Sequence, residues 1–74
     1  MAIIFSRHAR RQMKWRRVSE ADVVSVIGAP DRVEQSRDER INAYKSLGGR
    51  LLKATYVEEE ANIVVITVIE KESV

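Results

Sequence analysis

The sequence predicts an α+β fold in which two N-terminal helices are followed by an antiparallel sheet. Apolar residues recur at helical spacing up to residue 28 and alternate with polar residues after Pro30. Turn-forming segments then divide the rest of the chain into short strands. The 74 residues are enough for one domain, spanning residues 1–74, near the lower size limit for a self-sufficient core. Because the chain has no cysteine, neither a disulfide nor a thiolate metal site can add stability.

The first helix is expected over residues 7–16. Ser6 precedes it as an N-cap, and Ala9 and Met13 lie four residues apart, so they share one buried stripe. The apolar run at residues 3–5 is expected to be extended, and it would allow a short extra strand before this helix.

The second helix is expected over residues 20–27. Ser19 and Asp22 have the spacing of a capping arrangement, with an acid in the positive first turn. Pro30 prevents the helix from continuing. The buried stripe is supplied by Val23, Val24, Val26 and Ile27.

Four strands are expected after Pro30. Turns are predicted at residues 37–39, 47–49 and 58–62. The strand candidates are residues 32–36, 40–47, 50–57 and 62–70. Short connections favour an antiparallel meander, so we expect both helices to pack on one face of a curved four-stranded antiparallel sheet.

Alternation separates two faces of this sheet. We expect the helices to cover the face with Ile41, Leu52 and Ile66. The opposite face would then carry Arg40, Tyr44, Lys53, Thr55 and Thr67. Cations, a phenol and hydroxyls suit a phosphate backbone, although the same residues also fit an ordinary solvent-facing sheet. A one-residue error in phase would exchange the faces.

Positive charge is concentrated at the N-terminus. The first 17 residues contain six cations and no acid, whereas the remainder contains seven cations and eleven acids. The cations are Arg7, Arg10, Arg11, Lys14, Arg16 and Arg17. Such a local positive field predicts a polyanionic partner, RNA or DNA, to which these residues and Thr67 would bind. An acidic protein is the alternative partner.

The sequence predicts a cytoplasmic protein without a membrane partner. No apolar run approaches the roughly 18 residues that cross a bilayer. The N-terminus has no positive region ahead of its apolar stretch, so a secretory signal is not expected.

Several short motifs resemble the small bacterial RelE/ParE-superfamily domains of the BrnT-like kind. The motifs are His8-Ala9, Met13, Arg16 with Val18-Ser19, Arg40, Tyr44, Gly49-Arg50 with Leu52, and the run Val65-Ile66-Thr67-Val68. The resemblance covers nearly the whole chain and implies a RelE-like α+β fold.

The resemblance also implies candidate functions. RelE-like members are toxins of toxin–antitoxin pairs that cut RNA without metal. For this chain the resemblance leads us to expect an endoribonuclease without a cofactor that acts on messenger RNA, including messenger RNA associated with the ribosome. ParE-like members inhibit DNA gyrase, and many small relatives have no established activity. A toxin would have a cognate antitoxin as its partner.

Metal-independent RNA cleavage requires a base for the 2′-hydroxyl, an acid for the leaving oxygen, and cations for the phosphorane. His8 is the candidate base, because its unperturbed pKa lies near neutrality. Arg16, Arg40 and Lys53 are candidate cations for the transition state, and Tyr44 could stack on a base or donate a proton. His8 could instead bond a nearby backbone group.

Three interpretations stay open. The domain could be an endoribonuclease, a ParE-like gyrase inhibitor, or a binding module without catalysis. Trp15 could stack on a nucleobase or anchor its helix to the core. An apolar strip of Ile63, Val65 and Ile69 could serve an antitoxin or a homodimer.

Overall fold

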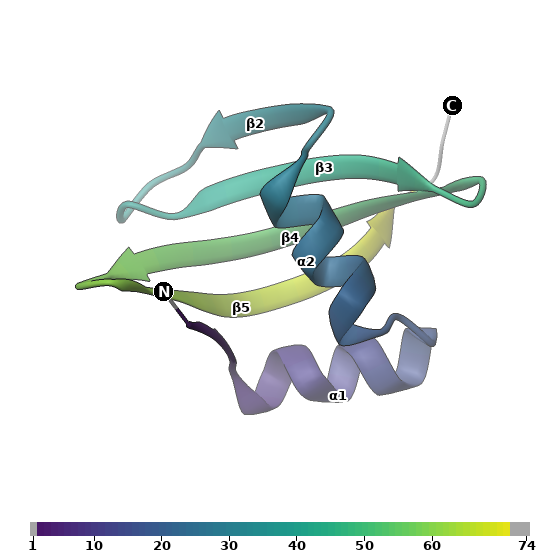
Figure 1. The fold of residues 1–74 in the computed structure, drawn as a ribbon, viewed down its shortest axis with the longest axis horizontal. Helices are drawn as coiled ribbons and strands as arrows, with labels where there is room; N and C mark the ends of the chain where they lie inside the picture. The colour runs from purple at the N-terminus through teal and green to yellow at the C-terminus, as the bar shows by residue number, and fades with distance from the viewer. Residues whose placement is uncertain (1, 72–74) are drawn as a thin grey trace.

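Two helices pack against one side of a five-stranded sheet in the computed structural model, which describes residues 2–71 (Figure 1). The elements are β1 (Ile3–Phe5), α1 (Arg7–Arg16), α2 (Glu20–Gly28), β2 (Arg32–Gln35), β3 (Ile41–Leu47), β4 (Arg50–Glu59) and β5 (Asn62–Lys71). The predicted α+β class and the order of two helices before the main strands are confirmed.

The sheet is mixed rather than purely antiparallel, and it has five strands rather than four. Its strand order is β1-β5-β4-β3-β2. Strands β2 to β5 form the predicted antiparallel meander. β1 adds a parallel pair, with Ile3 opposite Ile63 and Phe5 opposite Val65. The apolar run at the N-terminus thus protects part of the β5 edge, which would otherwise present unpaired backbone groups.

Both helices begin as the sequence predicts. The Ser6 hydroxyl accepts a hydrogen bond from the Ala9 amide at 3.0 Å. At α2, Ser19 and Asp22 form a reciprocal capping box with bonds of 3.0 and 3.1 Å. These bonds satisfy backbone donors that the first turn of a helix leaves without partners.

A β-bulge in β5 changes which side chains face the helices. Thr55 pairs with Thr67, but the next residue of β4, Tyr56, pairs with Val65, so Ile66 is the extra residue. Val65 and Val68 therefore both face the core and are 0% and 1% exposed. The predicted helix-facing position of Ile66 is wrong for this reason.

The same bulge rules out the expected apolar strip on β5. Val65 belongs to the core with Ile63 packed against it, whereas Ile69 pairs with Lys53 on the opposite face. Strict alternation cannot reveal this change, because one inserted residue reverses the facing of every residue beyond it.

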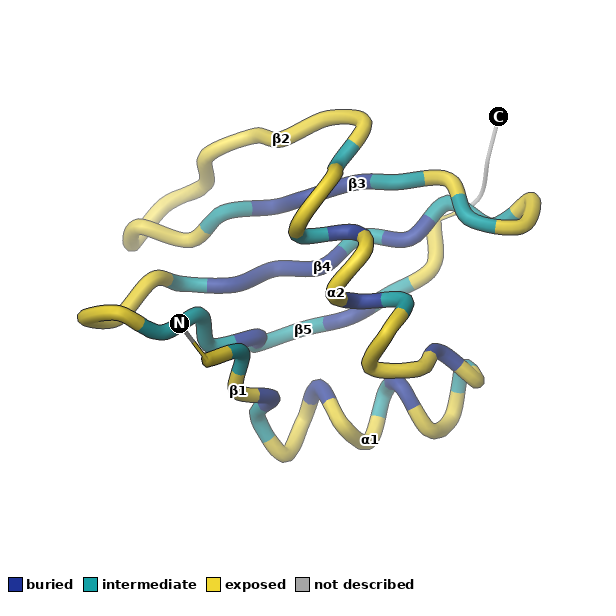
Figure 2. Tube along the Cα trace, in the orientation of Figure 1, coloured by how far each residue is buried: buried dark blue, intermediate teal, exposed yellow. Residues whose placement is uncertain are grey.

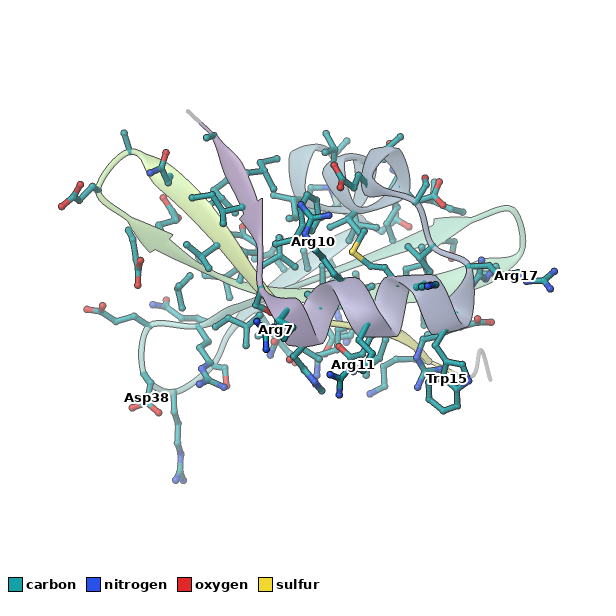
Figure 3. All side chains as sticks on the ribbon, turned by 90° about the horizontal axis from the view of Figure 1, so that it is seen from below. Arg7, Arg10, Arg11, Trp15, Arg17 and Asp38 are labelled. Atoms are coloured by element: carbon teal, nitrogen blue, oxygen red, sulfur yellow. The ribbon has the colours of Figure 1, made fainter. Side chains whose placement is uncertain are left out.

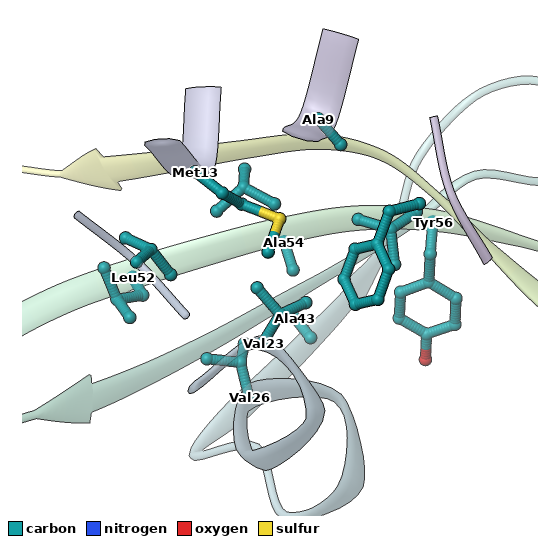
Figure 4. Close-up of a cluster of buried hydrophobic side chains, with 12 residues drawn as sticks. Ala9, Met13, Val23, Val26, Ala43, Leu52, Ala54 and Tyr56 are labelled. Carbon is teal, nitrogen blue, oxygen red and sulfur yellow. The ribbon is translucent and has the colours of Figure 1, made fainter. Parts of the chain in front are cut away.

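The core lies between the two helices and the central strands (Figure 4). Buried positions concentrate in β3, β4 and β5, while β2 is exposed along its length (Figure 2). Two alanines, Ala43 and Ala54, are almost fully buried beneath the helices. The helix residues in this core are Ala9, Met13, Val23 and Val26.

α1 runs along the edge of β5 beyond the end of β1. The Ser6 hydroxyl donates to the carbonyl of Ile66 at 3.0 Å, and the Gln12 side-chain oxygen accepts from the Val68 amide at 2.9 Å. At the other end of α1, Arg50 donates to the carbonyl of Arg16 at 2.7 Å and to Glu70 at 3.0 Å. These contacts fix α1 at the border between the two faces of the sheet.

Candidate nucleic-acid interface

Three cations surround the ring of Tyr44 on the face of the sheet that α2 does not cover, here called the outer face. The Arg32 guanidinium carbon lies 4.3 Å from the ring centre, and the ammonium nitrogens of Lys53 and Lys71 lie 5.8 and 6.0 Å from it. The register explains this arrangement, because Tyr44 is directly opposite Arg32 on β2 and Lys53 on β4.

Glu34 completes this group, which we call the Tyr44 cluster (Arg32, Glu34, Tyr44, Lys53 and Lys71). The Tyr44 hydroxyl donates a hydrogen bond of 2.8 Å to Glu34 Oε1. This bond, aided by the charge of Arg32, lowers the pKa of Glu34. Burial, followed by the bond to the carboxylate, raises the pKa of Tyr44. At neutral pH the cluster therefore combines three cations, one carboxylate and a protonated phenol.

A second polar pair lies next to the cluster. The Thr55 hydroxyl donates to the Asn42 side-chain oxygen at 2.7 Å, and both residues are buried. Thr55 is thus engaged within the protein, while Thr67 lies opposite it on β5. Thr67, the threonine predicted to contact nucleic acid, is therefore next to an internally bonded pair on the outer face.

The structure brings together two of the four predicted catalytic residues, Tyr44 and Lys53. Arg40 lies in the loop before β3, four residues and about 13 Å along the chain from Tyr44. His8 lies on α1 beside β5, which is two strands, or about 10 Å, from the strand of Tyr44. Neither is part of the Tyr44 cluster.

Stacking of Tyr44 on a nucleobase is ruled out by its surroundings. The residue is only 5% exposed, and the guanidinium of Arg32 lies over its ring. Its available role is to hold Glu34 through the phenol hydroxyl. The long side chains of Arg32, Lys53 and Lys71 shield the ring while their charged ends stay accessible to solvent.

The basic residues of α1 divide between two sides of the helix. Arg10 points toward α2, where it forms a 2.8 Å ion pair with Glu20 (Figure 3). Arg7, Arg11 and Trp15 point away from α2 (Figure 3). The cations on this second side therefore extend the positive charge of the outer face.

The end of α1 carries the remaining predicted contacts. Arg17 closes the helix in a left-handed conformation and is exposed. Lys14 lines a depression on α1. The Arg16 guanidinium carbon lies 5.3 Å from the centre of the Trp15 ring. Trp15 is 79% exposed, so the interpretation that it anchors α1 to the core is wrong.

The family described as "Domain of unknown function (DUF4258)" matches residues 5–70. The chain belongs to the DUF4258 family. No curated protein and no solved structure matches it.

Two further properties of this DUF4258 member bear on its chemistry. Within residues 2–71, no group of three or more histidine, cysteine, aspartate or glutamate side chains is arranged to hold a metal ion. Over the same residues, neither helix has the length and apolar character required to cross a bilayer.

Sequence reasoning missed Arg32, Glu34 and Lys71. Arg32 and Glu34 are two residues apart on a correctly predicted strand, so the sequence alone predicts that they share a face of the sheet. Their position beside Tyr44 depends on the β2–β3 register, which follows from the loop between these strands. Lys71 was missed because β5 extends one residue beyond its predicted end and its facing depends on the bulge.

Proposed function

We propose that the chain binds RNA on the outer face and cleaves it as a metal-independent endoribonuclease, the toxin-like component of a toxin–antitoxin pair. The Tyr44 cluster carries this proposal, because it places one ionised carboxylate among three cations. The cations would attract the phosphate backbone, and Glu34 would then lie next to the sugar hydroxyls. The assignment to messenger RNA and to a toxin–antitoxin pair draws on the resemblance to RelE/ParE-superfamily domains.

In the proposed reaction, Glu34 is the general base. Its Oε1 is held by Tyr44, which leaves Oε2 to take the proton of the 2′-hydroxyl. The 2′-oxygen then bonds to phosphorus as the bond from phosphorus to the 5′-oxygen breaks. The products are a 2′,3′-cyclic phosphate and a 5′-hydroxyl, whose proton comes from the ammonium of Lys53 or Lys71.

The cations contribute to the rate by stabilising the transition state. The phosphorane carries more negative charge than the ground-state phosphodiester, so Arg32, Lys53 and Lys71 stabilise it more strongly. Glu34 is a weak base, because its pKa is lowered by the bond from Tyr44 and the charge of Arg32. A carboxylate of low pKa gives a slow enzyme at neutral pH.

The weakness of this base also favours a second candidate function, RNA binding without cleavage. The same cations would hold the phosphates, and the Tyr44–Glu34 pair would only orient Arg32. The two candidates differ in one observable, which is whether RNA containing a 2′-hydroxyl is cut.

The test is cleavage of an end-labelled single-stranded RNA by the purified protein in EDTA. We expect cleavage to a 2′,3′-cyclic phosphate and no cleavage of DNA of the same sequence. Glu34→Gln should reduce the rate by roughly 10²- to 10⁴-fold without weakening RNA binding, because the amide keeps the shape but cannot take the proton.

Glu59→Gln, at an exposed carboxylate on β4, is the matched control and should leave the rate unchanged. Intact RNA with a folded wild-type protein that still binds it would support the binding-only candidate. Failure to bind RNA at low salt would exclude both candidates.

A further inference from the structure

Trp15 is the most exposed of the large hydrophobic residues of the described chain. It is 79% exposed near the C-terminal end of α1, and it is the only tryptophan in the sequence. Tryptophan is on average highly buried in folded proteins, because its large ring gains most from leaving water. Its position on the basic side of α1 therefore calls for a ligand with an aromatic or planar surface.

Trp15 borders a depression on α1. Among residues 2–71, its lining residues are His8, Arg11, Gln12, Lys14 and Trp15, and its volume is about 680 Å³. Their spacing of three and four residues places His8, Arg11, Gln12 and Trp15 along one side of the helix. Gln12 is fixed by its bond to the Val68 amide, so this side of α1 is anchored to β5.

The indole is held by Arg16. The guanidinium lies 5.3 Å from the ring centre, a cation–π distance, and Arg16 is itself tied to the sheet through its carbonyl bond to Arg50. One face of the indole is thus covered by a cation, while its high exposure leaves the other face accessible. This is the arrangement of a stacking platform.

We propose that this side of α1 binds single-stranded RNA, with a nucleobase stacked on Trp15 and the flanking phosphates on Arg11 and Lys14. The ligand rests on the proposed function, which supplies RNA as the substrate. An acidic peptide would use the cations but not the indole surface. A duplex would keep its bases stacked internally and away from Trp15.

The position of α1 connects this surface to the Tyr44 cluster. Arg11 and Trp15 point to the side that α2 does not cover, and α1 follows the β5 edge (Figure 3). A single strand leaving Trp15 toward the outer face would cross β5 near Ile69, which pairs with Lys53. The substrate class is therefore RNA with an unpaired stretch that spans both surfaces.

The test is the fluorescence of Trp15, which as the only tryptophan reports this site alone. The protein is titrated with a single-stranded 2′-O-methyl oligonucleotide, which cannot be cleaved through the 2′-oxygen. We expect quenching on binding. Trp15→Ala should bind the labelled oligonucleotide roughly fivefold to a hundredfold more weakly, and Trp15→Phe should restore most of the affinity.

Two variants separate stacking from charge. Lys14→Ala should reduce the slope of log affinity against log salt by about 0.7, whereas Trp15→Ala should leave that slope unchanged. Val24→Ala, at an exposed apolar position on α2, is the matched control and should bind as the wild type does.

The inference is overturned if the oligonucleotide binds without quenching and Trp15→Ala keeps full affinity. Equal quenching by polyglutamate would instead assign the surface to an acidic protein. RNA cleavage without quenching of Trp15 would remove this inference and keep the proposed function. Quenching of Trp15 without RNA cleavage would keep this inference and remove the proposed cleavage.

Discussion

The hydroxyl of Tyr44 donates a 2.8 Å hydrogen bond to Glu34, its diagonal neighbour across the β2–β3 ladder. Tyr44 is buried and Glu34 is exposed, so the bond joins a fixed phenol to a carboxylate at the surface. The bond lowers the pKa of Glu34, while burial and then the bond raise the pKa of Tyr44, so Glu34 stays charged and Tyr44 stays protonated. This pair defines the chemistry of the outer face.

The two tyrosines should ionise at higher pH in the folded protein than in the unfolded chain. Burial raises the pKa of both Tyr44 and Tyr56 above 10.0. Because the folded state holds these protons more tightly, their contribution to stability is complete below about pH 10 and is lost as the pH rises through the folded pKa values.

An absorbance titration of phenolate, with and without denaturant, measures this difference. Tyr44→Phe should remove one of two delayed transitions and leave the other. A folded protein in which both phenols ionise near 10 would contradict the described environment of the rings.

The pKa of Glu34 should depend on the Tyr44 hydroxyl. In the wild type the hydrogen bond from Tyr44 holds the pKa of Glu34 below 4.5. Its contribution to stability is present above the unfolded pKa and is lost as the pH falls through the lowered folded value. In Tyr44→Phe the pKa of Glu34 should rise toward its ordinary value, because the largest cause of the shift is gone.

Carboxyl carbon shifts followed by NMR between neutral and acidic pH measure the Glu34 titration directly. An unchanged Glu34 titration in Tyr44→Phe would show that the hydrogen bond has no electrostatic effect.

Arg50 should stabilise the docking of α1 on the sheet. Its guanidinium binds the carbonyls of Arg16 and Arg17 and the carboxylate of Glu70. Arg50→Ala is expected to lower the free energy of unfolding by about 1–2 kcal/mol, since the bonds are charge-assisted but partly exposed. Urea denaturation measures the change.

Arg37→Ala removes an exposed arginine from the β2–β3 loop and should change stability by less than about 0.5 kcal/mol. Equal effects of the two substitutions would mean that the Arg50 contacts contribute nothing measurable. If Arg50→Ala keeps the wild-type free energy of unfolding but abolishes quenching of Trp15 by the oligonucleotide, Arg50 acts in ligand binding only.

Local signals predicted most of the fold. Ser6, Ser19 and Asp22 mark the helix starts through hydrogen bonds that span three residues. Short turns and alternation predicted the meander of β2 to β5. The parallel pairing of β1 with β5 was not predictable in this way, because it joins residues 60 positions apart in the sequence.

The candidate site was predicted in part. Alternation placed Tyr44 and Lys53 on one face, but the partners on β2 depend on a loop in which Asp38 and Glu39 both adopt left-handed conformations, with φ of 59° and 62°. Such conformations are unusual for residues other than glycine, and the sequence gives little sign of them. The β5 bulge obscured the facing of Lys71 in the same way.

The central claim, that the Tyr44 cluster acts on RNA, is tested most directly by comparing RNA cleavage in EDTA by the wild type and by Lys53→Ala/Lys71→Ala. We expect the double variant to cleave RNA at no more than about one hundredth of the wild-type rate, because two of the three cations that stabilise the phosphorane are lost. Arg37→Ala should cleave as the wild type does. Equal cleavage by the wild type and a folded double variant would contradict the account.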